Sequence, residues 1–187
     1  MNKEKFLKEN CPDRHNTNCS KWDILEKKYG DSELISMWVA DMDFKAPKEV
    51  IETLRKKIDF GIFGYSLTKD EYYESFIRWE KKYHNWEVKK DWIRFTPGVV
   101  TGIFWCVNML TQKDDAIIIN MPVYYPFHHA IEDVGRKLVY SELINTNGVY
   151  TVDFDDFERK VVENNVKLYI LCSPHNPVGR VWKEEEL

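Results

Sequence analysis

The stretch that decides the fold is Leu171-Cys172-Ser173-Pro174-His175-Asn176-Pro177-Val178-Gly179-Arg180-Val181-Trp182. It follows an apolar run, residues 166–172, that predicts a buried strand, and a charged stretch typical of a helix start begins at Lys183. The two prolines remove backbone donors and disfavour helix in the residues before them. We therefore expect the chain to leave a sheet at its carboxyl edge in a rigid polar loop, where ligands bind in open α/β sheets.

Asn176 is the candidate ligand-binding residue of this loop, because its side-chain amide can both donate and accept hydrogen bonds. The alternative is an ordinary proline-rich turn in which the asparagine caps a helix. The loop by itself does not separate these two interpretations.

Upstream of the loop, residues 92–172 alternate between strand-like and helix-like patterns. Such alternation predicts an α/β fold with a largely parallel sheet and right-handed crossovers. The run Ala116–Ile119 is continuously apolar, as expected for a strand covered on both faces. The expected strands are Ile93–Phe95, Ala116–Asn120, Lys137–Glu142 and Leu168–Cys172, and the expected helices are Val99–Leu110, Tyr125–Val134 and Asp153–Glu163; Asn145–Gly148 is a turn signal.

The first 85 residues predict mainly helices and irregular segments. Residues 1–20 are polar, which fits either a flexible arm or a segment that wraps a partner. Apolar spacing and glycine or proline punctuation give the remaining elements. These are a helix over Trp22–Tyr29, a short strand over Leu34–Val39, a turn over Ala40–Phe44, a helix from Pro47 to Phe60, and a helix over Asp70–Asn85 whose wide aromatic stripe predicts packing on two sides.

Composition narrows the classes of function. The 187 residues are 43% hydrophobic and 31% charged, with a net charge of −4 and both signs interspersed. No basic tract suggests nucleic acid, and no apolar run is long enough for a transmembrane helix. The N-terminus lacks the apolar core of a signal peptide. We therefore expect a cytoplasmic globular protein that binds neither nucleic acid nor membrane.

The four cysteines are Cys11, Cys19, Cys106 and Cys172, and they show no metal-site spacing. We interpret them as reduced thiols, with Cys106 and Cys172 in the core. Asp41 and Asp43 lie two residues apart, which invites a metal hypothesis, but no further carboxylate or histidine completes a ligand set. Turn capping is the simpler interpretation of the pair, and we expect no metal site.

The stretch Phe95-Thr96-Pro97-Gly98-Val99-Val100 predicts an anion site. A strand would end here, Gly98 would turn the chain, and a helix would begin. The unpaired N–H groups of a first helical turn, together with the helix dipole, attract a phosphate group. The pattern matches neither a Walker loop nor a dinucleotide fingerprint, which disfavours a nucleotide.

Taken together, five stretches resemble the fold-type I pyridoxal phosphate (PLP) enzymes, and most closely the aminotransferase-like cystathionine β-lyases. The stretches occur in the order of that family and span the chain from about residue 20 onward. They are the Asn176 loop, Met37–Phe44, Phe63–Ser66, Thr96–Ile103 and Pro122–Phe127. The resemblance implies the N-terminal part of a fold-type I PLP-dependent transferase, with an incomplete large domain.

Within this resemblance, the matching positions have specific roles toward PLP. The N–H groups of Val99 and Val100, after Gly98, would hold the phosphate. Tyr124 would stack on the pyridine ring, although Tyr125 is adjacent and the assignment depends on the order Pro-Val-Tyr. Asn176 would hydrogen-bond the 3-hydroxyl oxygen.

The resemblance also implies roles for residues nearer the N-terminus. The backbone near Ala40 would face the carboxylate of an amino-acid substrate. Tyr65 would reach the cofactor phosphate of a neighbouring subunit, which implies a homodimer with shared active sites. Residues 1–46 would then form an arm and contribute to a small domain, and residues 47–187 would begin the PLP-binding large domain.

The lysine that forms a Schiff base with PLP has no match in these 187 residues, so the sequence resembles the N-terminal half of a longer enzyme. We expect the full-length protein to be a PLP-dependent C–S β-lyase that acts on cystathionine or cysteine-like substrates. The alternatives are an aminotransferase of the same fold and a truncated, non-catalytic fragment. An unrelated nucleotide-binding α/β protein is disfavoured by the missing glycine-rich fingerprint.

Overall fold

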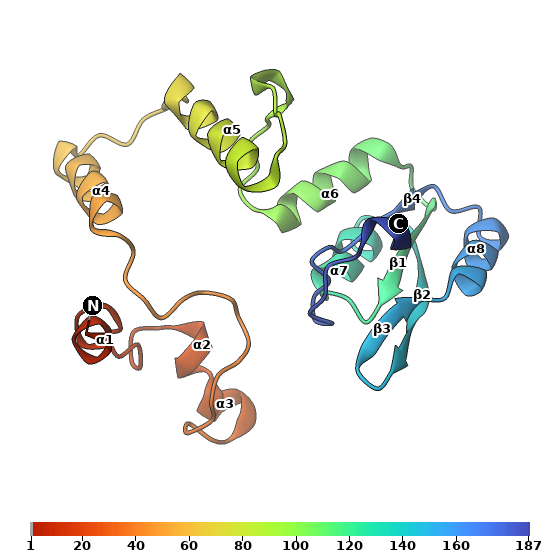
Figure 1. Ribbon diagram of the computed structural model, residues 1–187, viewed down its shortest axis with the longest axis horizontal. Helices are drawn as coiled ribbons and strands as arrows, with labels where there is room; N and C mark the ends of the chain where they lie inside the picture. Colours follow the sequence, from red (N-terminus) through yellow and green to blue (C-terminus); the bar gives the residue numbers. More distant parts are fainter. Residues whose placement is uncertain (1) are drawn as a thin grey trace. The chain divides into compact units, whose positions relative to one another are not determined.

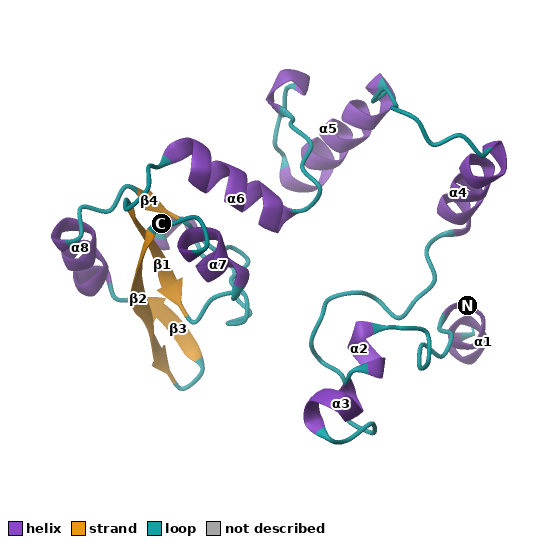
Figure 2. Cartoon of the chain, turned by 180° about the vertical axis from the view of Figure 1, so that it is seen from behind, coloured by secondary structure: helices purple, strands orange, loops and turns teal. Residues whose placement is uncertain are grey.

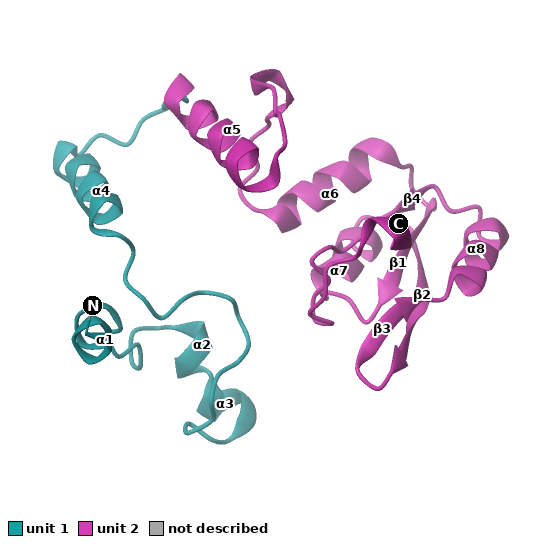
Figure 3. Cartoon of the chain, in the orientation of Figure 1, with its two compact units in different colours: residues 1–68 teal, residues 69–187 magenta. Residues whose placement is uncertain are grey.

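A computed structural model describes residues 2–187 of the chain. The chain forms two compact units, residues 1–68 and residues 69–187, which Figure 3 shows in two colours. The expected division into residues 1–46 and 47–187 concerns functional domains, and it stays a prediction.

The first unit is helical, and local signals set where its helices end. Gly30 and Gly61 both adopt the left-handed conformation, with φ of 74° and 73°, and each closes the helix before it. The helices are α1 (Lys3–Asn10), α2 (Ser20–Asp23), α3 (Leu25–Tyr29) and α4 (Lys48–Phe60) (Figure 1). The expected single helix over Trp22–Tyr29 is thus two short helices, and the irregular N-terminus contains α1.

The predicted strand over Leu34–Val39 is wrong, because these residues pair with no neighbouring strand in the described part of the chain. Alternating apolar residues make a strand only when a partner completes the backbone hydrogen bonds.

The second unit is built around a four-stranded sheet, drawn in orange in Figure 2. Its order is β3-β2-β1-β4, with β1 parallel to both β2 and β4 and β2 antiparallel to β3. The mostly parallel sheet of the prediction is therefore confirmed. The strands are β1 (Ala116–Met121), β2 (Lys137–Thr146), β3 (Val149–Val152) and β4 (Leu168–Tyr169).

Two details of the predicted sheet are wrong. Residues Ile93–Phe95 are not a strand, since a short 3-10 turn, η1 (Lys90–Trp92), leads into an irregular segment. The expected strand Leu168–Cys172 is only two residues long, although the Ile170 N–H still donates to the carbonyl oxygen of Ile118 at 3.1 Å.

Helices flank the sheet as the alternating pattern predicts. The helix α6 has the predicted bounds, whereas the others differ at their ends by one or two residues. The elements are α5 (Asp70–His84), α6 (Val99–Leu110), α7 (Pro126–Glu132), α8 (Phe154–Glu163) and a final 3-10 turn, η2 (Glu184–Glu186), where a helix start was expected.

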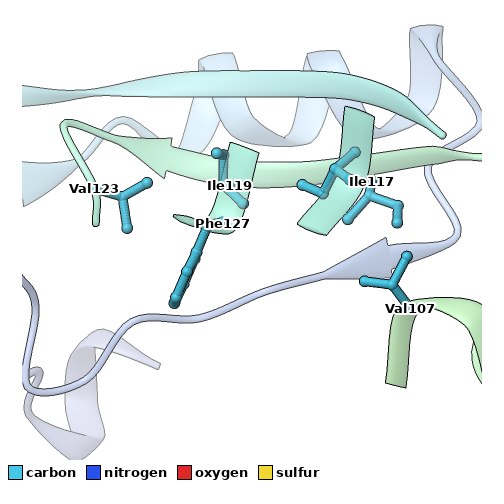
Figure 4. Close-up of a cluster of buried hydrophobic side chains, with 6 residues drawn as sticks. Val107, Ile117, Ile119, Val123 and Phe127 are labelled. Atoms are coloured by element: carbon cyan, nitrogen blue, oxygen red, sulfur yellow. The ribbon is translucent and has the colours of Figure 1, made fainter. Parts of the chain in front are cut away.

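The strand β1 carries the core of this unit because its successive side chains point to opposite faces. Ile117 and Ile119 pack on one face with Val107, Val123 and Phe127, as Figure 4 shows. Ile118 packs on the other face in a second cluster with Ala116 and Val139. All three isoleucines of β1 are fully buried. A strand covered on both faces explains why this run has no alternation of polar residues.

Other apolar residues of the second unit remain exposed. The aromatic stripe of α5 predicted packing on two sides. In the part of the chain that the structure describes, none of the α5 side chains is buried, and Trp79 is 56% exposed. The prediction that Cys106 lies in the core is also wrong, because its thiol is exposed on α6, whereas Cys172 is half-buried.

Helix α8 is fixed to the sheet through Asp156. The Ser141 hydroxyl of β2, which is fully buried, donates to Asp156 Oδ2 at 2.8 Å, and Lys160 Nζ lies 2.8 Å from the same oxygen. Lys160 and Ser141, with Arg159, lower the pKa of Asp156 to about 2. The ionised carboxylate is therefore the form that the folded state stabilises.

We expect Asp156→Asn to lower the free energy of unfolding at neutral pH. A carboxyl group whose pKa is lowered by folding stabilises the folded state above its ordinary pKa, and it loses this effect as the pH falls toward the folded value. The stability difference between wild type and Asp156→Asn should therefore be constant above about pH 5 and shrink toward pH 2. Urea unfolding at a series of pH values measures it.

Asp155 supplies the matched control, because it lies in the same helical turn and is exposed. A pH-independent difference between wild type and Asp156→Asn, or an equal response of Asp155→Asn, would contradict the role assigned to Asp156.

Among residues 2–187, no helix combines the length and the apolar character needed to cross a bilayer.

Candidate functional site

The Asn176 loop follows β4 and folds back on itself. The His175 N–H donates to the Arg180 carbonyl oxygen at 2.7 Å, and the Gly179 N–H donates to the His175 carbonyl oxygen at 2.7 Å. Asn176 lies at the exposed tip, and its side-chain amide has no hydrogen-bond partner within residues 2–187. The loop is thus ordered by its backbone, which leaves the Asn176 amide available for a ligand.

His175 anchors this loop, and the sequence interpretation missed it. Its side chain is 2% exposed, and Nε2 lies 2.9 Å from the Pro122 carbonyl oxygen. Since a carbonyl oxygen only accepts, Nε2 carries the hydrogen. The ring also packs edge-on against Trp182, with centroids 5.5 Å apart. His175 therefore ties the Asn176 loop to the segment that follows β1.

Tyr124 lies in that same segment, two residues after the Pro122 carbonyl that His175 contacts. Its ring is 37% exposed and makes edge-on contacts with Tyr125 and Phe127, at centroid distances of 5.4 and 6.4 Å. A half-exposed ring held by two aromatic neighbours retains surface on which a flat ligand can stack. The structure thus brings the Tyr124 segment and the Asn176 loop together.

Gly98 forms the turn before α6, with φ of 129° and ψ of 155°. This conformation is almost restricted to glycine. The helix closes through the Gly102 N–H, which donates to the Gly98 carbonyl oxygen at 3.1 Å, and no side chain caps its start. The N–H groups of Val99 and Val100 have no acceptor in the described part of the chain. They are available to an anion, as the sequence predicts.

An apolar groove of about 470 Å³ connects the start of α6 with the end of β4. Thr96 and Val99 line the groove near the start of α6. Leu171, which leads into the Asn176 loop, lines it near the end of β4. The N-terminus of α6 and the root of the Asn176 loop therefore border the same groove.

A tyrosine and an asparagine form a second buried polar contact that the sequence did not indicate. The Tyr169 hydroxyl on β4 donates to Asn120 Oδ1 on β1 at 2.5 Å. Burial, with a smaller effect of the Cys172 thiol, raises the pKa of Tyr169 to about 12, so the phenol stays protonated and keeps donating. Asn120 is 3% exposed. This contact couples the two parallel strands just before their carboxyl ends.

Ala40 and Tyr65, the two remaining candidates, belong to the first unit. Both are exposed, and Tyr65 lies in an irregular segment between α4 and α5. The structure brings the candidates of the second unit onto neighbouring segments, and the roles of all the candidates, Ala40 and Tyr65 included, stay predictions. In residues 2–187 no three metal-ligand side chains are grouped so as to hold an ion.

Comparison with known proteins identifies the family of this chain. A sequence model of the aminotransferase class I and II family matches residues 32–187, which is most of the chain. The chain belongs to the aminotransferase class I and II family.

The chain is similar over 94% of its length to proteins of this family that are about twice as long. It is 39% identical over 175 residues to cystathionine beta-lyase PatB of Bacillus subtilis, of which it covers 45%. Among solved structures it resembles cystalysin from Treponema denticola, which contains a pyridoxal 5'-phosphate cofactor (41% identity, TM-score 0.84, 45% of that chain covered).

The PLP-bound C–S lyase from Staphylococcus hominis gives 41% identity and a TM-score of 0.82, again with 94% of this chain and 45% of that chain covered. These similarities confirm the predicted resemblance and the incomplete fold. The chain spans about half the length of the relatives it matches.

Proposed function

We propose that the full-length protein is a PLP-dependent C–S β-lyase that acts on cystathionine or cysteine-like amino acids. The similarity to PatB and to the Staphylococcus hominis C–S lyase carries this proposal, because both are named for C–S or cystathionine cleavage. The runner-up is an aminotransferase, which the family description favours.

The residues of the second unit fit PLP in charge and in shape. The free N–H groups of Val99 and Val100 suit its phosphate, the half-exposed Tyr124 ring suits its flat pyridine ring, and the unengaged Asn176 amide suits its 3-hydroxyl oxygen. When bound, PLP serves as an electron sink for the carbanion that an amino acid forms on losing its α-proton.

The chain's own residues would bind and orient the reactants. The α6 N-terminus would fix the phosphate, and His175, through Pro122, would hold the Tyr124 segment in place relative to Asn176. Asn176 would donate to the 3-hydroxyl oxygen and so favour its deprotonated form. The backbone at Ala40 would bind the substrate carboxylate.

The overall reaction balances as an elimination followed by hydrolysis. The bond between the β-carbon and sulfur breaks, the sulfur leaves as a thiolate that takes up a proton, and the substrate loses its α-proton. One water then releases the remaining fragment as pyruvate and ammonia. In the aminotransferase alternative the amino group passes instead to a keto acid, and no C–S bond breaks.

Purified full-length protein, loaded with PLP and supplied with cystathionine, distinguishes the two reactions. The lyase proposal predicts equal amounts of new thiol and pyruvate without any added keto acid. Thiol is measured with a thiol-specific reagent and pyruvate with a coupled dehydrogenase. Keto-acid-dependent transfer of the amino group without thiol release would overturn the lyase proposal in favour of the aminotransferase.

We propose further that the full-length protein is a homodimer, in which the exposed Tyr65 reaches the cofactor phosphate of the partner subunit. The complete exposure of Tyr65 in this chain supports the assignment. A cytoplasmic location likewise stays a prediction.

A further inference from the structure

The backbone at Val39 is strained. Val39 has φ of 56°, in the left-handed region that a β-branched side chain rarely enters. Such a conformation persists only where the surrounding structure enforces it, and strain of this kind clusters at functional sites. Ala40, the next residue, has no hydrogen bond from its backbone N–H or carbonyl within residues 2–187. The strained residue therefore precedes an unpaired peptide group.

Asp43, four residues after Val39, is the centre of a cluster of polar contacts. Its Oδ1 accepts from Arg14 Nη1 at 2.8 Å and from Trp22 Nε1 at 2.9 Å, and its Oδ2 accepts from Lys21 Nζ at 2.7 Å. The side chain of Asp43 is 28% exposed and that of Lys21 is 12% exposed. The Lys21 ammonium, with Trp22 and Arg14, holds the pKa of Asp43 well below its usual range.

The two cations also hold the backbone between Ala40 and Asp43. Arg14 pairs with the Asp41 carboxylate, and its Nη1 lies 3.3 Å from the Met42 carbonyl oxygen. Lys21 Nζ lies 3.1 Å from the Asp41 carbonyl oxygen. Three successive residues after Ala40 are thus fixed by the same two side chains.

Helix α1 contacts the other end of this segment, at Phe44 and Lys45. The Lys45 N–H donates to the Asn10 carbonyl oxygen at 2.8 Å, Lys45 Nζ donates to the Glu9 carbonyl oxygen at 2.7 Å, and the Phe6 and Phe44 rings lie 6.0 Å apart. Residues 41–45 therefore have little freedom to relax the strain at Val39. The arm expected over residues 1–20 has a definite partner within its own chain.

We infer that Asp43 is a positioning residue, which, through Arg14, Lys21 and Trp22, holds Val39 in its strained conformation and so keeps the Ala40 peptide group free to bind the substrate carboxylate. This inference rests on the proposed function, because it deepens the role of Ala40 in substrate binding. Asp41 and Asp43, the two acids for which a metal site was considered, pair with Arg14 and Lys21.

The test compares Asp43→Asn with Glu9→Gln in the full-length, PLP-loaded protein. Asparagine keeps the shape of Asp43 but removes its charge and places an amide where Lys21 donates. Glu9→Gln is the matched control, because the Glu9 side chain forms only an exposed pair, 4.0 Å from Lys5, and the contact of Glu9 with Lys45 comes from its backbone carbonyl, which the substitution keeps. Each variant is measured for KM, kcat, PLP content and thermal unfolding.

We expect Asp43→Asn to raise the KM for the amino-acid substrate by about tenfold or more, while kcat and PLP content stay within about threefold of wild type. The dissociation constant of L-alanine, measured from the change in cofactor absorbance, should rise by a similar factor. Glu9→Gln should change neither value. An Asp43→Asn KM equal to that of Glu9→Gln, or a fall confined to kcat, would overturn the inference.

A second substitution separates positioning from general stability. Val39→Gly removes the strain, since glycine adopts positive φ without a steric penalty. If the cluster acts by enforcing this conformation, adding Val39→Gly to Asp43→Asn should recover much of the lost affinity for L-alanine. A purely structural role predicts no recovery. Should Asp43→Asn fail to fold, Trp22→Phe removes one donor to Asp43, keeps an aromatic ring, and is read in the same way.

The outcomes also separate this inference from the proposed function. If wild-type protein releases no thiol but transfers amino groups, the lyase proposal fails, and the L-alanine titrations still decide the role of Asp43. If wild type is a lyase and Asp43→Asn binds L-alanine normally, only the positioning inference fails.

Discussion

Replacing Ile119 with alanine is expected to lower the free energy of unfolding of the second unit by about 2–5 kcal/mol. Ile119 is fully buried on β1, which lies between β2 and β4, and it packs in the cluster with Val123 and Phe127 (Figure 4). Truncation removes buried methyl groups and leaves a cavity that a paired central strand cannot collapse to fill. Urea unfolding of the chain, followed by tryptophan fluorescence, measures the change.

Ile144→Ala is the matched control for this prediction. Ile144 lies on β2 of the same sheet, and its substitution removes the same atoms, but its side chain is 46% exposed. An exposed site of this kind should change stability by only about 0.5 kcal/mol. Equal losses for the two variants would mean that β1 does not carry the core of the unit.

Replacing Gly98 with alanine in the full-length protein is expected to weaken PLP binding by about tenfold or more. At φ of 129° and ψ of 155° a Cβ atom is strongly disfavoured, so the turn must shift and re-aim the N–H groups of Val99 and Val100. A hydrogen bond to a charged phosphate contributes about 1.5–3 kcal/mol, so loss of one bond accounts for the tenfold change. Equilibrium dialysis of the apoprotein against PLP measures the affinity.

Gly148→Ala separates this effect from general strain. Gly148 also has positive φ, 86°, but it lies in the β2–β3 turn and no part of the proposed site includes it. Both variants should unfold at lower temperature, by amounts that reflect about 1–3 kcal/mol of backbone strain. Only Gly98→Ala should lose affinity for PLP. If Gly98→Ala binds PLP as tightly as Gly148→Ala, the phosphate does not bind at the start of α6.

The success of the sequence interpretation depended on how local each signal was. Helix α6 has the predicted bounds, because Gly98 and the apolar run after it act on their own neighbours. The sequence also marked Asn145–Gly148 as a turn, and Asn147 and Gly148 both adopt positive φ, 52° and 86°, as a tight hairpin turn requires. The strand after this turn was missed, since β3 exists only through its pairing with β2.

For the candidate site, the sequence identified the loops but not what holds them. Gly98, Tyr124 and Asn176 were identified from motifs, and the second unit places them at neighbouring segments. His175 was missed, because a histidine beside a motif does not reveal that it is buried or that it bonds to Pro122, 53 residues earlier. The contacts of Asp43 with Arg14 and Lys21 span 29 and 22 residues, and no periodicity in the chain indicates them.

The sequence by itself thus determined the family, the alternating order of strands and helices, and the segments that carry the candidate residues. Glycine, proline and caps fix local backbone angles, and continuous apolar runs fix what is buried, so these features need no distant partner. Tertiary structure alone decided which strand-like segments became strands and which charged side chains met. A strand needs backbone partners, and an ion pair needs two side chains that only the folded chain brings within a few ångströms.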